Sequence, residues 1–92
     1  MTKTYVGDVG TEIRLETEAS LAGATTLEIA ARKPDGTEAT WTATADGTVV
    51  RYFTEAGDLD QSGQWLLQAV VVTPSGAWRG ETAKLKVYPE YR

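Results

Sequence analysis

Cysteine and histidine are both absent from this chain of 92 residues. Without cysteine it can form neither a disulfide bond nor a thiolate metal site. Without histidine it lacks the commonest general base and the commonest metal ligand. Paired carboxylates remain as an enzymatic option, but most of the 13 acidic residues alternate with apolar ones and are expected on solvated strand faces. We therefore expect a protein that is not an enzyme and that uses no metal or cofactor.

Positive charge and long apolar runs are also scarce. The chain has 9 Lys and Arg against 13 Asp and Glu, which gives a formal net charge of -4. Sequence-independent binding of nucleic acid needs a basic face, and a polybasic membrane anchor needs one too, so neither partner is expected. No run of ~18 apolar residues is present, and residues 1–5 carry no apolar signal core. These features predict one unprocessed domain over residues 1–92, synthesised in the cytoplasm.

Turn-forming residues occur at regular intervals along the chain. Pro-Asp-Gly stands at 34–36, Ala-Asp-Gly at 45–47 and Pro-Ser-Gly at 74–76, where proline and glycine suit the backbone angles of tight turns. The stretches between them are short and rich in Thr, Val, Ile, Trp and Tyr. This pattern predicts an all-β, immunoglobulin-like antiparallel β-sandwich of about seven to eight strands.

Alternation of apolar and polar residues predicts the strands and their inward faces. We expect strands at 12–16, 27–32, 40–44, 48–53, 64–72 and 77–88. The expected inward side chains are Ile13, Leu15, Leu27, Ile29, Ala31, Trp41, Ala43, Val50, Tyr52, Trp65, Leu67, Ala69, Val71, Leu85 and Val87. In the last strand, strict alternation back from Leu85 would expel Trp78, so we predict a bulge at Gly80 that restores the register.

The segment Gly57-Asp58-Leu59-Asp60-Gln61-Ser62-Gly63 has two interpretations. Asp-x-Asp followed by Gly is similar to the start of a calcium loop, although the bidentate Glu and other oxygen ligands are missing. Alternatively the segment is a corner, in which Asp58 caps a short helical turn, Leu59 fills the core and Gly63 leads into the next strand. We favour the corner.

Aromatic residues leave a carbohydrate-binding alternative open, because their faces stack on the apolar faces of sugars. Trp65 is expected in the core, and Trp41 and Trp78 fall on predicted inward faces. Tyr5, Tyr88 and Tyr91 lie near the chain ends and can be exposed. A host-surface polysaccharide is therefore a possible ligand.

The outer face of the strand at 64–72 is unusually apolar. Leu66, Val70 and Val72 point away from the predicted core, where a half-buried strand would normally carry polar side chains. Either the chain's own ends and loops cover this face, or it is an interface with a partner or with further copies of the chain. The candidate interface residues are Leu66, Val70, Val72, Tyr88 and Tyr91.

Six segments, taken in order, resemble a family of phage proteins. They are Tyr5-Val6-Gly7-Asp8-Val9-Gly10-Thr11, Leu21-Ala22-Gly23-Ala24-Thr25, Lys33-Pro34-Asp35-Gly36-Thr37, Ala56-Gly57-Asp58-Leu59-Asp60, Gly63-Gln64-Trp65-Leu66-Leu67-Gln68 and Gly80-Glu81-Thr82. The chain is similar to the immunoglobulin-like N-terminal domain of phage baseplate upper proteins, and more similar to small stand-alone virion proteins of tailed phages and prophages. The resemblance runs nearly end to end.

The resemblance implies a structural or adhesive protein of the bacteriophage virion with no catalytic residues. Its partners would be tail, baseplate, neck or capsid proteins, with capsid decoration one option. Baseplate upper proteins continue into stalk and oligomerising segments, whereas this chain stops at Arg92. We therefore expect no trimerisation through such a stalk, and the position on the particle stays open.

Overall fold

A computed structural model describes residues 4–89 of the protein, and these residues form nine strands and no helix. None of the described residues lies in a helix long and apolar enough to cross a membrane. The strands are β1 (Thr4–Tyr5), β2 (Glu12–Glu16), β3 (Thr26–Arg32), β4 (Glu38–Thr42), β5 (Thr44–Asp46), β6 (Val49–Phe53), β7 (Gly63–Thr73), β8 (Gly76–Arg79) and β9 (Ala83–Tyr88).

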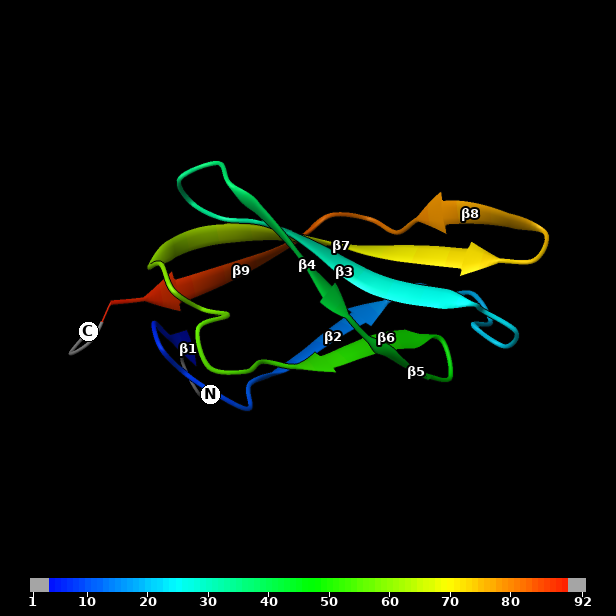
Figure 1. Cartoon of the computed structure of the whole chain (residues 1–92), viewed down its shortest axis with the longest axis horizontal. Helices are drawn as coiled ribbons and strands as arrows, with labels where there is room; N and C mark the ends of the chain where they lie inside the picture. The colour runs from blue at the N-terminus through cyan, green and yellow to red at the C-terminus, as the bar shows by residue number, and fades with distance from the viewer. Residues whose placement is uncertain (1–3, 90–92) are drawn as a thin grey trace.

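The strands form two sheets that pack face to face (Figure 1). The larger sheet has the order β1-β9-β7-β3-β4, with β8 also paired to β7, and the smaller sheet has the order β2-β6-β5. All pairs are antiparallel except β1 with β9. The neighbours β3-β7-β9 and β2-β6-β5 correspond to strands C-F-G and B-E-D of an immunoglobulin sandwich. The predicted all-β fold class is confirmed.

The strand predicted at 40–44 spans a change of sheet. β4 pairs with β3 in the larger sheet, whereas β5 pairs with β6 in the smaller one. Between them, the amide of Ala43 donates a hydrogen bond to the carbonyl of Leu27 at 2.9 Å. Alternation continues through the change, because Trp41 and Ala43 are both buried. The inward face was predicted correctly, but the division into two strands was not.

The strand predicted at 77–88 is also divided, at the place where the bulge was predicted. β8 pairs with residues 70–73 of β7, and β9 pairs with residues 63–67. Residues 68–69 of β7 therefore face three residues, 80–82, and the amide of Gly80 donates to the carbonyl of Ala69 at 3.0 Å. The additional residue shifts the register, so that Trp78 and Leu85 both pack against the core.

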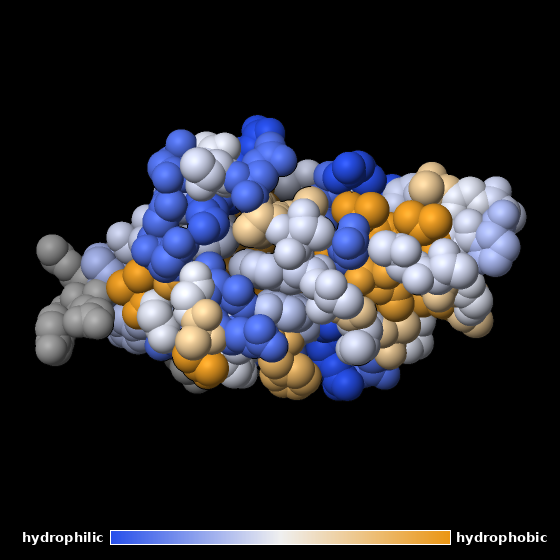
Figure 2. All heavy atoms as spheres, viewed as in Figure 1, coloured by the Kyte–Doolittle hydropathy of each residue, from blue (hydrophilic) through white to orange (hydrophobic). Residues whose placement is uncertain are grey.

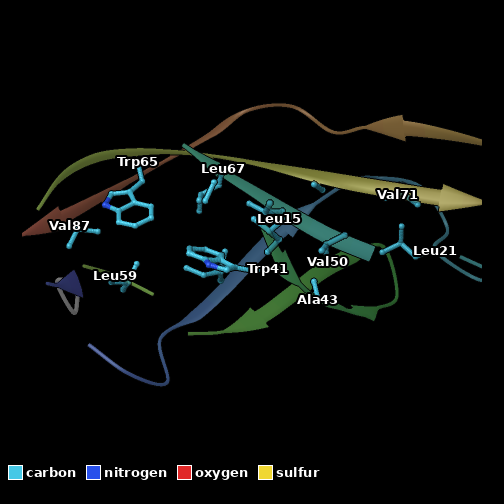
Figure 3. Close-up of a cluster of buried hydrophobic side chains, with 14 residues drawn as sticks. Leu15, Leu21, Trp41, Ala43, Val50, Leu59, Trp65, Leu67, Val71 and Val87 are labelled. Atoms are coloured by element: carbon cyan, nitrogen blue, oxygen red, sulfur yellow. The ribbon is translucent and has the colours of Figure 1, made fainter. Parts of the chain in front are cut away.

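The core lies between the two sheets and contains the predicted inward residues (Figure 3). Trp65 of β7 is fully buried, and Trp41 of β4 lies next to it with 6.1 Å between ring centroids. Trp41 also stacks on Tyr52 of β6 at 5.1 Å, which joins the two sheets through aromatic contact. Leu27, Tyr52, Trp78 and Leu85 are only half-buried, at the edges of this core.

Candidate functional site

The outer face of the larger sheet carries the predicted row of apolar side chains. Leu66, Val70 and Val72 lie on the side of β7 opposite the core, and each is half-buried. Their cross-strand neighbours are mostly long or charged: Leu66 lies between Arg32 and Lys84, and Val70 between Glu28 and Arg79. Aliphatic stems of such residues cover apolar surface while their charges stay in water, which explains the partial burial.

A shallow groove crosses this face beside Leu66. It has a volume of about 250 Å³, and Ala30, Leu66 and Gln68 form part of its lining. Gln68 is held in place, because its side-chain amide donates to the carbonyl of Gly80 at 2.9 Å. Arg32 and Glu38 form an ion pair of 2.7 Å at the rim. The groove therefore combines apolar and ordered polar side chains.

The two tyrosines predicted at the interface have different outcomes. Tyr88 lies at the end of β9, is half-buried, and has its ring centroid 6.1 Å from that of Tyr5. The ammonium of Lys86 lies 5.0 Å from the Tyr88 ring centroid. Val87, the residue before Tyr88, pairs with Gly63 at the start of β7, whereas Val70 and Val72 pair with β8 near the other end of β7. Tyr88 is therefore far from these two valines along the sheet. Tyr91 lies outside the described residues.

The segment 57–63 forms a corner with its own hydrogen bonds. The carboxylate of Asp58 accepts bonds from the amide of Glu55 at 2.7 Å and from the hydroxyl of Tyr52 at 2.5 Å. Burial and the bond to Asp58 together raise the pKa of Tyr52 far above its usual value. Asp58 thus accepts a backbone N–H group of the turn, as the corner interpretation predicts, but it does so from the last residue of a turn that is not helical. Leu59 is fully buried, as the corner interpretation requires.

Asp60 and Gln61 of the corner also bind within the protein. The carboxylate of Asp60 accepts from the ammonium of Lys33 at 3.0 Å, and the carbonyl of Gln61 accepts from the indole of Trp65 at 3.0 Å. The side-chain amide of Gln61 donates to Asp35 at 2.9 Å. Among residues 4–89 no three acidic side chains come together in a way that could hold a metal ion. The geometry is that of a structural corner.

Four of the six segments that carry the expected resemblance to phage proteins meet at this end of the sandwich. The segment 33–37 contacts the corner as described above, and the segment that starts at Gly63 follows it directly. The N-terminal segment joins them, since the amide of Gly7 donates to the carbonyl of Leu59 at 2.8 Å. The four segments contact one another, so packing of loops at one end of the sandwich explains why these residue types occur together.

A second groove lies at the open side of the sandwich, between the loop that follows β2 and the link from β8 to β9. It has a volume of about 780 Å³, and its lining residues are Glu16, Thr17, Glu18, Ala19, Trp78, Arg79, Gly80 and Glu81. Sequence reasoning missed this groove because its two walls are about 60 residues apart in the chain. The one signal in the sequence was Trp78, which was predicted to point inward.

Trp78 differs from the other two tryptophans in its exposure. Trp65 is 0% exposed and Trp41 is 5% exposed, whereas Trp78 is half-buried at the edge of the core. The groove wall is therefore the place where a tryptophan of this protein meets solvent.

Comparison with known proteins gives no match: no family model, no curated protein and no solved structure is significantly similar to this chain.

Proposed function

We propose that this protein is a structural component of a bacteriophage virion, an immunoglobulin-like module that docks on a larger particle protein of the tail, baseplate, neck or capsid. The proposal starts from the resemblance of six ordered segments to small virion proteins. It assigns no chemical reaction to the chain, and it places the protein in the virion after synthesis in the host cytoplasm.

The observation that carries the docking role is the outer face of the larger sheet. Leu66, Val70 and Val72 form a row of half-buried apolar side chains on the central strand β7, beside the groove at Ala30. Figure 2 shows apolar side chains reaching the surface toward the end of the molecule where β3, β7 and β8 lie. Apolar groups with a charged rim are typical of the centre and edge of a protein–protein interface.

Repeated weak contacts fit this surface better than one strong contact. The row is narrow, and each apolar residue has charged or polar neighbours on the flanking strands. A virion offers many identical sites, so modest affinity at each site is sufficient when several copies bind together. We therefore expect the free protein to be a monomer or a weak oligomer.

Quantitative mass spectrometry of purified particles tests the virion role. The protein should be present at many copies per particle, in a fixed ratio to a tail or capsid protein. Its absence from clean particles would overturn the proposal.

The docking face is tested separately by Val70→Lys, which places a charge in the middle of the row. The variant should fold normally, because Val70 points away from the core, and should be incorporated at least about tenfold less than the native protein, since a buried charge in an interface costs more than 1.4 kcal/mol. Val9→Lys is the matched control, because Val9 is 64% exposed in a loop. Equal incorporation of both variants would exclude this face as the docking surface.

A further inference from the structure

We infer that the groove at Trp78 is a carbohydrate-binding site for pyranose sugars that are neutral or carry an amino group. This site opens between the two sheets and not on the outer sheet face, although Arg79 lines both grooves, and the inference does not depend on the virion role. Its walls are the loop that follows β2 and the link between β8 and β9. A volume of about 780 Å³ is within the usual size of small-ligand sites.

One wall of the groove carries the aromatic ring of Trp78. A pyranose ring has an apolar face of C–H groups and a polar edge of hydroxyl groups, so it binds well where an aromatic ring stands near hydrogen-bond acceptors. Trp78 supplies the ring, and its position at the edge of the core leaves part of it open to the groove. Its partner across the sheet is Val71, which is fully buried and fixes the base of the side chain.

Two carboxylates of the groove are available to a ligand. Glu18 and Glu81 line the groove from opposite walls and are exposed, and their side-chain carboxylates have no hydrogen-bond or ion-pair partner within residues 4–89. Arg79 also lines the groove, but its guanidinium contacts the side chain of Gln68 on the other face of the sheet, at 3.4 Å. Hydrogen-bond acceptors therefore outnumber donors among the side chains of the groove. This favours sugars that carry hydroxyl and ammonium groups and disfavours acidic sugars.

The loop that carries Glu18 is held in a defined shape. The carboxylate of Glu16 accepts the amide of Glu18 at 2.9 Å, and the hydroxyl of Thr17 donates to the carbonyl of Thr48 at 2.6 Å. Glu18 has φ of 58° and is the one non-glycine residue with positive φ in the described part of the chain. Its side chain is thus presented by an ordered turn, so little ordering is needed when a ligand binds.

Binding is tested with short oligomers of glucosamine, of N-acetylglucosamine and of galacturonic acid, in mildly acidic buffer. Tryptophan fluorescence should change with glucosamine and N-acetylglucosamine oligomers, with dissociation constants in the millimolar range or better, and glucosamine should bind more tightly. Galacturonic acid oligomers should not bind. Failure of all three sugars at about 10 mM would overturn the inference, as would equal binding of the acidic sugar.

Three variants of groove residues and one control variant locate the site. Trp78→Phe should weaken binding about fivefold or more when followed by calorimetry, whereas Val70→Lys on the outer sheet face should leave it unchanged. Glu81→Gln and Glu18→Asn should weaken binding of the glucosamine oligomer more than binding of the N-acetylglucosamine oligomer. Asparagine is suitable at position 18 because it tolerates positive φ. Circular dichroism confirms folding of each variant.

Two results would overturn the assignment even if a sugar binds. One is a sugar affinity that Trp78→Phe does not change. The other is binding of short lysine oligomers without any sugar, which would make the groove a site for basic peptides.

Discussion

Gly63 lies so close to Pro34 that a side chain has no room between them. A Cβ atom at Gly63 would be 2.9 Å from Cγ and 3.0 Å from Cβ of Pro34, and Gly63 itself has φ of 127°. The contact joins the turn between β3 and β4 to the first residue of β7. Gly63 is also the last residue of the corner segment 57–63, so the contact holds that segment against the turn between β3 and β4.

Gly63→Ala is therefore expected to destabilise the protein. The substitution combines a steric clash with an unfavourable backbone angle, and we expect a loss of about 1–3 kcal/mol in the free energy of unfolding. Urea denaturation measures the change. Gly76→Ala is the matched control, since nothing lies within 4 Å of a Cβ there and its φ is not positive; a similar loss in both variants would contradict the role of Pro34.

Tyr52→Phe should destabilise the corner. The phenol donates to the carboxylate of Asp58, and hydrogen bonds to charged groups are worth more than neutral ones, so we expect a loss of about 1–3 kcal/mol. The stacking on Trp41 is kept by phenylalanine, which isolates the contribution of the hydroxyl. Chemical denaturation at neutral pH gives the measurement, and an unchanged midpoint would show that the bond contributes nothing.

Alkaline titration provides an independent check of Tyr52. Burial, and then the hydrogen bond and the negative charge of Asp58, raise the pKa of Tyr52 above its usual value. A raised pKa means that the neutral phenol stabilises the fold fully below pH about 10, and that this stabilisation is lost as the pH rises toward the folded-state pKa. Absorbance of tyrosinate should show a late component that Tyr52→Phe lacks. Identical titration curves would exclude the assignment.

Thr37→Val should raise the pKa of Asp35. The hydroxyl of Thr37 donates to Asp35 at 2.7 Å and its amide donates at 2.9 Å, and these bonds, with that from Gln61, hold the pKa below its usual value. A lowered pKa means that the contribution to stability is present above the unfolded pKa of about 3.9 and is lost as the pH falls through the folded-state pKa. Carboxyl carbon chemical shifts followed by NMR would detect the change, and an unchanged titration in the variant would contradict it.

Iodide should quench the fluorescence of one tryptophan. Trp65 and Trp41 are buried, whereas Trp78 is half-buried at the edge of the core. The native protein should therefore show a partly quenched signal, and Trp78→Phe should show almost none. Strong residual quenching in that variant would mean that Trp41 or Trp65 is accessible, contrary to the packing in Figure 3.

Local alternation of the sequence predicted which side of each strand is buried. Ile13 and Leu15, or Trp65 and Leu67, are inward because successive side chains of a strand point to opposite faces and only one face meets the core. The bulge near Gly80 followed from the same reasoning, since Trp78 and Leu85 cannot both face inward in one unbroken register. The apolar row on the outer face of β7 was found in the same way.

Pairing between distant segments was decided by the tertiary structure alone. The change of sheet at Ala43 depends on which strands lie beside β4 and β5, and local alternation is the same on both sides of that change. The groove at Trp78 exists because residues 16–19 lie opposite residues 78–81. The sequence by itself thus determined the fold class and the inward faces, which depend on neighbours along one strand, whereas the groove and the corner contacts depend on long-range packing, for which no local pattern exists.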